Sequence, residues 1–262
     1  MKIALSIAGS DSGGGAGIQA DLKTFEHFGT FGTTVLVAVT AQNTLGVSAV
    51  HLVPDAVVRA QLAALAADLP PAALKTGMLA TAACIATVAE TVAAAGWGPL
   101  VVDPVMVATS GDRLLAPDAD LAYRERLFPL AALVTPNLDE AEVLCGFPVR
   151  DVPQMTRAGA TLLRMGAAAA LVKGGHGHGD EVLDVLVTRD GSRTFRHPRL
   201  ASTSTHGTGC TLSAAITALL ALGHPLEPAV EAGLDYTWRA IRDAPGLGAG
   251  RGPVRHGVSG ER

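Results

Sequence analysis

The sequence is poor in aromatic residues, in charge and in cysteine. Aromatic side chains make up 4% of its 262 residues and charged ones 17%, with a formal net charge of −4. That charge gives no electrostatic basis for binding nucleic acid or an anionic membrane surface, so neither is predicted as a partner. The three cysteines, Cys84, Cys145 and Cys210, form neither a disulfide framework nor a metal-binding clip, which predicts a reducing, cytoplasmic location.

Long apolar runs are also lacking. No uninterrupted run reaches the roughly 18 residues of a membrane span, and the run at 3–8 is shorter than the apolar core of a signal peptide. The hydrophobic content of 48% excludes a disordered chain. Because composition does not shift along the chain, one domain over residues 1–262 is predicted. The last twenty residues are rich in glycine, proline and arginine, which by composition predicts a flexible tail.

Short β-branched segments alternate with longer segments of helical period. This alternation predicts an α/β fold around a mostly parallel sheet. The predicted strands are 2–8, 33–39, 73–76, 99–103, 131–135, 168–173, 182–188 and 193–199. The predicted helices are 18–28, 54–68, 81–95, 117–128, 137–145, 152–165, 208–222 and 225–242.

The loop at 9–17 holds five glycines between a strand and a helix. Gly15, Gly17 and Ala20 match a dinucleotide-binding pattern, but that pattern needs an acidic residue at the end of the second strand. No Asp or Glu follows that strand before Asp55, and no GK[ST] motif of a phosphate-binding loop occurs. The glycines therefore favour close approach of the backbone to a small ligand.

Residues 206–210, His-Gly-Thr-Gly-Cys, precede a strongly apolar helix. Backbone N–H groups of a glycine-rich turn at a helix N-terminus, together with the helix dipole, bind anions. Cys210 lies in the first turn, where the thiol pKa is expected to fall below its reference of about 8.5. We therefore assign a function to Cys210, and a structural role to Cys84 and Cys145.

Polar side chains also follow three buried strands. Asp103 ends one strand, Asn137 and Glu140 open the helix after the next, and Lys173 ends a third. Two carboxylates suit Mg²⁺. Glu140 taken alone would better suit a helix cap, and beside Asp103 and the anion-binding turn both interpretations stay open. A lysine before two glycines favours contact with phosphate. Three histidines lack the spacing of a zinc site and are predicted to be loop or surface residues: His176, His178 and His206.

In order, and along nearly the whole chain, these segments resemble the hydroxymethylpyrimidine/phosphomethylpyrimidine kinases of thiamine biosynthesis, which are ribokinase-like proteins. The matching segments are 6–23, 39–44, 75–78, 103–107, 110–112, 135–142, 173–176, 206–213 and 248–256. The resemblance implies a three-layer α/β sandwich with a central mostly parallel sheet and a small flap over the active site. It also implies that the C-terminal motif at 248–256 is ordered, against its composition.

The resemblance further implies ATP, Mg²⁺ and a pyrimidine that carries a hydroxymethyl group. It implies that Gly9, Asp21, Gln42, Met78 and Val105 bind the pyrimidine. Asp21 and Gln42 would bond its amino group and ring nitrogens, Met78 and Val105 would pack on the ring, and Gly9 would allow its close approach. It implies Asp103 and Glu140 for the metal ion, and Asn137, Lys173 and Thr208 for ATP. The catalytic set that it implies is Cys210, Lys173, Gly207 and Gly209, and it leaves a homodimer open.

In the expected reaction the hydroxymethyl group faces the γ-phosphate of ATP. Mg²⁺ and Lys173 neutralise the triphosphate, while the backbone amides of residues 207–210 meet the charge that develops during transfer. Because the transition state of phosphoryl transfer is loose, a base is needed only late and weakly, and a partly ionised Cys210 thiol is predicted to serve. The resemblance alone implies a second transfer, from the monophosphate to the diphosphate.

Three alternatives stay open. Pyridoxal kinase is the nearest, since pyridoxal is also a flat heterocycle with a hydroxymethyl arm. A subgroup resembling this family has a second cysteine in the flap, and residues 104–111 contain none. A pyrimidine sensor without catalysis is the second alternative, and the intact polar set argues against it. A nicotinamide oxidoreductase is the weakest, because the acidic residue after the second strand is missing.

Overall fold

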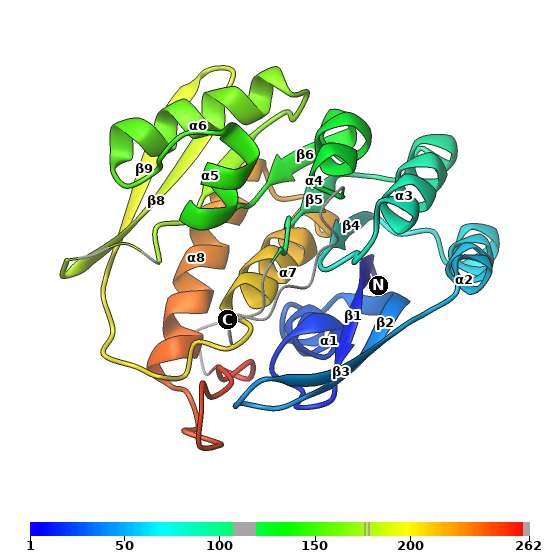
Figure 1. Ribbon diagram of the computed structural model, residues 1–262, viewed down its shortest axis with the longest axis horizontal. Helices are drawn as coiled ribbons and strands as arrows, with labels where there is room; N and C mark the ends of the chain where they lie inside the picture. Colours follow the sequence, from blue (N-terminus) through cyan, green and yellow to red (C-terminus); the bar gives the residue numbers. More distant parts are fainter. Residues whose placement is uncertain (107–118, 176, 178, 259–262) are drawn as a thin grey trace.

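The computed structural model describes residues 1–106, 119–175, 177 and 179–258, and their strands form one nine-stranded sheet (Figure 1). The strands are β1 (Ile3–Asp11), β2 (Phe31–Gln42), β3 (Val47–Leu52), β4 (Ala73–Thr76), β5 (Leu100–Val102), β6 (Ala131–Val134), β7 (Ala170–Val172), β8 (Glu181–Thr188) and β9 (Gly191–Pro198). Their order is β3-β2-β1-β4-β5-β6-β7-β8-β9. The six strands from β2 to β7 in this order pair in parallel, and antiparallel strands border them at both edges, so the predicted mostly parallel sheet is confirmed.

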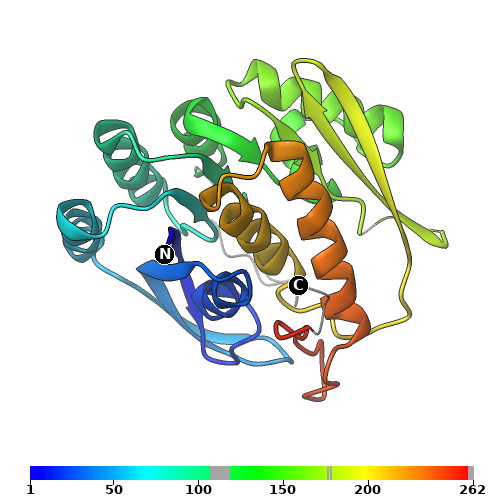
Figure 2. The ribbon, with the colours of Figure 1, turned by 180° about the vertical axis from the view of Figure 1, so that it is seen from behind.

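Helices cover both faces of the sheet, as the two opposite views show (Figures 1 and 2). They are α1 (Gly17–His27), α2 (Asp55–Asp68), α3 (Ala82–Ala95), α4 (Ala119–Ala122), α5 (Leu138–Cys145), α6 (Val152–Arg164), α7 (Thr208–Ala221) and α8 (Leu226–Arg242). Neighbouring residues of a buried strand alternate between the layers. Val101 packs in the cluster that contains α7 and α8, and Val102 in the cluster that contains α2 and α3. The predicted three-layer sandwich is therefore confirmed.

Two elements differ from prediction. β3 was not predicted, because its side chains are nearly all exposed and carry no buried alternation; it pairs antiparallel with β2 across a turn closed by Asn43 and Gly46. The helix predicted at 117–128 is a short α4 followed by a π-helical turn (Tyr123–Leu127) and a 3-10 turn (Phe128–Leu130). Pro129 has no N–H to continue an α-helix. Residues 117 and 118 lie outside the described part.

The C-terminal segment is folded onto the molecule, so the composition-based flexible tail is wrong for residues up to 258. The N–H of Arg251 donates to the Thr44 carbonyl at 2.9 Å, and the Tyr236 hydroxyl donates to the His256 carbonyl at 2.8 Å. Contacts with distant segments decide order here, and composition does not register them. The order implied by the family resemblance for 248–256 is confirmed.

Two further observations bear on expectations from the sequence. Of the flap segment, residues 107–111 lie outside the described part of the chain, so the flap stays a prediction. Within the described ranges, no helix has both the length and the apolar character required to cross a membrane.

Candidate active site

A cavity of about 760 Å³ opens at the carboxyl ends of the parallel strands. The ends of parallel strands meet at one edge of a sheet, so loops far apart in the chain converge there. Twelve of the thirteen predicted site residues line this cavity: Gly9, Gln42, Met78, Asp103, Val105, Asn137, Glu140, Lys173, Gly207, Thr208, Gly209 and Cys210. The exception is Asp21.

Asp21 lies beneath the cavity and is not among the residues that line it, and its contact with the substrate stays a prediction. It is fully buried on the inner face of α1, where it accepts hydrogen bonds from Ser6 and from the Lys75 ammonium at 2.7 Å. Lys75 also donates to the Cys210 carbonyl at 3.4 Å. Burial lowers the pKa of Lys75, but the charge and hydrogen bond of Asp21, together with the other acidic groups near it, outweigh burial and raise the pKa, so the ammonium stays charged. The pair therefore supports the start of α7 from below.

The Cys210 thiol is a weaker acid than predicted. Burial raises its pKa to about 11; the Lys75 charge lowers it, and the carboxylates of Asp21 and Asp103 raise it again. The prediction of a lowered pKa, drawn from the helix N-terminus alone, is wrong because the thiol is buried and two buried carboxylates lie in the same region. A thiol with this pKa keeps its proton at neutral pH, so Cys210 is not the partly ionised base expected.

The first turn of α7 presents its backbone to the cavity. Gly207 has φ +80°, and a Cβ there would collide with the Gly15 carbonyl oxygen, so only glycine fits. Gly209 faces the side chains of Lys173 and Asp103: a Cβ on Gly209 would lie 3.2 Å from Lys173 Nζ and 3.5 Å from Asp103 Oδ2. The first N–H groups of a helix have no partners within the helix, so the start of α7 offers donors to an anion in the space beside those side chains.

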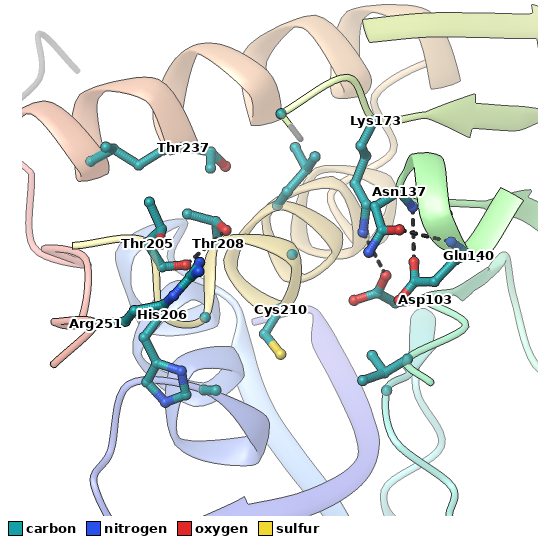
Figure 3. A pocket seen from close by; sticks show the side chains of 18 of the residues that line it. Asp103, Asn137, Glu140, Lys173, Thr205, His206, Thr208, Cys210, Thr237 and Arg251 are labelled. Atoms are coloured by element: carbon teal, nitrogen blue, oxygen red, sulfur yellow. Dashed lines mark hydrogen bonds and ion pairs between the residues drawn. The ribbon is translucent and has the colours of Figure 1, made fainter. Parts of the chain in front are cut away.

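Asp103 and Lys173 lie at the centre of a wall of the cavity that also includes Glu140, here called the acidic wall (Figure 3). The buried Asp103 carboxylate accepts hydrogen bonds from Lys173 Nζ at 2.9 Å and from Thr135 Oγ1 at 3.1 Å. Burial lowers the pKa of Lys173, but the charges of Asp103 and Glu140 more than compensate and raise it above its ordinary value. The wall thus holds a fixed positive charge between two acids.

Glu140 is both a helix cap and a member of this wall. Its side chain accepts from the Asn137 N–H at 2.8 Å, and Asn137 Oδ1 accepts from the Glu140 N–H at 2.9 Å, a reciprocal capping box. Burial raises the pKa of Glu140 to about 7; the Lys173 charge lowers it and the Asp103 charge raises it. The capping interpretation is therefore confirmed, and the carboxyl group still lines the cavity.

A second wall, formed by Gly9, Gln42, Met78 and Val105 and here called the ring-binding wall, suits a flat, partly polar ring. A Cβ on Gly9 would lie 2.5 Å from the Met78 methyl group, so the absence of a side chain keeps this surface open. Met78 and Val105 supply apolar surface and Gln42 supplies a side-chain amide. Gln42 Oε1 accepts from Thr40 Oγ1 at 3.2 Å, which turns its NH₂ group away from that bond.

His206 lies in the loop before α7, as predicted, but it is buried and is not a surface residue. Its Nε2 lies 2.8 Å from Asp11 Oδ2, and the Asp11 carboxylate also accepts from the N–H groups of Gly15 and Ala16. Burial raises the pKa of Asp11, but the bonds from His206 and the backbone amides outweigh it and lower the pKa. This pair joins the first loop to the start of α7. His176 and His178 lie outside the described residues.

The side of the cavity between β9 and α8 was not predicted from the sequence. Its lining includes Pro198, Leu212, Leu234, Thr237 and Trp238, and the Trp238 indole donates to the Pro198 carbonyl at 2.8 Å. No motif marks these residues, because the packing of α8 beside β9 brings them to the cavity. The only sequence signal is the apolar stripe of α8, which by its period alone is typical of a core-facing helix.

A family model described as phosphomethylpyrimidine kinase matches residues 11–255. The chain belongs to this family. A Rhizobium meliloti (strain 1021) protein named hydroxymethylpyrimidine/phosphomethylpyrimidine kinase is 52% identical over 259 residues, which cover 97% of this chain and 96% of that protein. The family predicted from the sequence motifs is therefore confirmed.

Solved structures of kinases share the fold of this family member. The crystal structure of phosphomethylpyrimidine kinase from Clostridium difficile 630 has a TM-score of 0.82 and 42% identity, covering 92% of this chain and 100% of that one. The ADP complex of Bacillus subtilis pyridoxal kinase has a TM-score of 0.91 and 37% identity, covering 98% and 97%. The predictions of a ribokinase-like fold and of a kinase are confirmed, and the oxidoreductase and sensor alternatives lose their support.

Proposed function

We propose that the protein transfers the γ-phosphoryl group of ATP to a hydroxymethylpyrimidine and then to the resulting monophosphate, in thiamine biosynthesis. The observation that carries this proposal is a cavity in which the ring-binding wall of Gly9, Met78 and Val105 faces the first turn of α7. The names of the relatives support the choice of substrate. A heterocycle on that wall directs its exocyclic arm toward the backbone amides and Lys173.

The residues of the acidic wall fit Mg²⁺. Asp103 and Glu140 offer carboxylate oxygens, and the charge of one raises the pKa of the other, a repulsion that a divalent cation would relieve. In the described residues no three His, Cys, Asp or Glu side chains gather as a metal site. Two carboxylates completed by phosphates and water are typical of Mg²⁺. When bound, Mg²⁺ would neutralise charge on the phosphates of ATP.

The chain's own groups would then position the reacting atoms. Lys173 and the Asn137 NH₂ group would contact the nucleotide phosphates from the acidic wall, and Thr208 would do so from α7. The amides of Gly209 and Cys210 would stabilise charge on the transferred group. The acceptor oxygen forms the new bond to the γ-phosphorus, the bond to the bridging oxygen breaks, and ADP leaves. In the first transfer the hydroxyl proton of the alcohol passes, late in the step, to an oxygen of the transferred phosphoryl group or to water. Cys210 contributes its amide and the pocket surface, since its thiol stays protonated.

Three broader expectations remain part of the proposal. A single kinase domain over residues 1–262 is supported by the one sheet that runs through the described residues. A homodimer is compatible with the exposed apolar side chains of Val39, Val50 and Leu52 on β2 and β3, and light scattering after gel filtration tests it. The cytoplasmic location rests on the three free cysteines.

Product analysis tests the function. The protein is incubated with ATP, Mg²⁺ and hydroxymethylpyrimidine, and the monophosphate and diphosphate are separated by chromatography. We expect the monophosphate first and the diphosphate after it. Absence of both products would overturn the proposal. An Asp103→Asn variant serves as control for a contaminating kinase, because it keeps the shape of the acidic wall and removes its charge.

Pyridoxal is the second candidate substrate, because the pyridoxal kinase from Bacillus subtilis is so similar in fold. A parallel assay with pyridoxal, at matched concentrations, compares kcat/KM for the two heterocycles. We expect the pyrimidine to dominate. A higher kcat/KM for pyridoxal would instead assign the protein to that activity.

A further inference from the structure

We infer that Arg251 binds the phosphate of the monophosphate substrate and thereby serves the second transfer specifically. This inference rests on the proposed function, in which the same site accepts first an alcohol and then a phosphomonoester. The second acceptor brings a dianion into a cavity that already holds a nucleotide triphosphate. A cation other than those engaged with the nucleotide is therefore needed to offset the repulsion.

Among the described residues that line the cavity, the three Lys and Arg side chains differ in what they contact. Lys173 is paired with Asp103 at 2.9 Å. Arg199 donates to the backbone carbonyls of Gly175 and Gly179 at 2.9 and 2.8 Å. Arg251 alone of the three has an exposed side chain with neither an ion pair nor a hydrogen bond to another described residue. As far as the described residues go, its guanidinium is therefore free to bind a ligand.

The backbone around Arg251 is held in place from two sides. Its N–H donates to the Thr44 carbonyl at 2.9 Å, and the next carbonyl, of Gly252, accepts from the His206 N–H at 3.0 Å. Thr44 lies two residues beyond Gln42 on the pyrimidine side, and His206 immediately precedes the α7 turn. The backbone of Arg251 is thus fixed between the ring-binding wall and the backbone amides at the start of α7. An acceptor phosphate would lie between these two parts of the site.

The position of Arg251 favours the acceptor phosphate over the nucleotide. Figure 3 shows Arg251 beside the 205–208 turn, on the other side of Cys210 from Asp103 and Glu140. The acidic wall, with its proposed Mg²⁺, addresses the triphosphate from that far side. A guanidinium offers two parallel N–H donors to one phosphate, and such charge-assisted pairs are shorter and stronger than neutral hydrogen bonds. In the second transfer an oxygen of this phosphate bonds to the γ-phosphorus and ADP leaves, with no proton to remove from a dianion.

Separate kinetics of the two steps test the inference. For Arg251→Gln we expect KM for the monophosphate to rise about 10- to 100-fold, because a charge-assisted bidentate contact is lost. KM for hydroxymethylpyrimidine and for ATP should change less than about twofold. Arg251→Lys should recover part of the lost affinity for the monophosphate, since lysine keeps the positive charge but lacks the two parallel N–H donors of the guanidinium. Arg255→Gln is the matched control, because Arg255 is also exposed in this segment but does not line the cavity.

The possible outcomes separate the inference from the function it rests on. Equal losses in both steps would assign Arg251 to the fold of the segment, and a selective rise in KM for ATP would assign it to the nucleotide; either overturns the inference while the two-step activity stands. Unchanged kinetics for Arg251→Gln would overturn it as well. If the unaltered protein converts no monophosphate to diphosphate, the second step of the proposed function fails, and the inference fails with it.

Discussion

Glu140 binds its proton more tightly in the native protein than in the unfolded chain, because its pKa rises from 4.5 to about 7 on folding. Between these values the native state holds more protons, so the contribution of Glu140 to the free energy of unfolding falls as pH rises. Without Mg²⁺, we expect this contribution to be fully present below about pH 4.5 and lost by about pH 7. Glu140→Gln should flatten that part of the stability curve, as measured by urea unfolding across pH.

Mg²⁺ should reverse this trend, because it binds the ionised carboxylate. The rise in melting temperature produced by Mg²⁺ with ADP should therefore be larger at pH 8 than at pH 6 for the unaltered protein. In Glu140→Gln the rise should be small and independent of pH. An equal rise at both pH values in the unaltered protein would contradict a role for Glu140 at the metal ion.

Lys75 and Asp21 form an ion pair with no exposed surface on either side chain. Lys75→Met leaves the Asp21 carboxylate buried without its counter-charge, which costs about 3 to 5 kcal/mol of unfolding free energy. Adding Asp21→Leu removes that charge, so the double variant should regain most of the loss. Urea unfolding of the two single variants and the double variant measures the coupling. Additive losses would show that the pair does not act as a unit.

The Lys75–Asp21 pair also illustrates which properties of single residues the sequence did not predict. The motifs identified which residues gather at the cavity, since strand ends and a glycine turn place them there. They did not distinguish Asp21, whose side chain points under the cavity, from Gln42, whose side chain borders it. The thiol pKa of Cys210 likewise depends on carboxylates distant in sequence. Orientation and electrostatics arise from packing between elements, which no single segment encodes.

At the level of elements, α7 offers a matched pair of glycines. Gly207 begins the helix at φ +80° against the Gly15 carbonyl, whereas Gly223 follows its end at φ +91° with no heavy atom within 4 Å of where a methyl group would lie. Gly207→Ala should lower kcat about 100-fold, because the amides of the turn are displaced from the transferred group. Gly223→Ala should cost about 1 kcal/mol of stability and leave kcat unchanged. Similar kcat values for both variants would show that the turn does not position the reaction.

The elements were predicted where burial leaves a pattern. Buried central strands such as β5 and β6 have continuous apolar runs, and long helices such as α8 have an apolar stripe. β3 was not predicted from the sequence because it is an exposed edge strand, fixed by its pairing with β2. The π-helical turn after α4 was not predicted either, because burial of Tyr123 and the proline that follows the turn set its geometry, and helix propensity does not. Tertiary contacts decide both cases.

At the level of the whole molecule, the C-terminal segment connects the two sides of the cavity. Gly250 packs against the Thr44 carbonyl of the β2–β3 turn, and Pro253 pairs with His206 before α7. Composition suggested a free tail here because it cannot register contacts between segments so far apart in the chain. The segment thus links the pyrimidine wall to the phosphate-binding turn, and displacing it should disturb both.

Gly250→Ala tests this link, because a methyl group there would collide with the Thr44 carbonyl, whereas Gly257→Ala meets no atom within 4 Å and is the control. We expect Gly250→Ala to raise KM for both acceptor substrates and to speed amide hydrogen exchange at 43–46 and 204–208 together, since both segments lose the same support. Faster exchange at 43–46 alone would show that the hairpin and the turn are held independently. A rise in KM without any change in exchange would place the effect on Arg251 alone, because the two segments would then have kept their support while the neighbouring side chain moved.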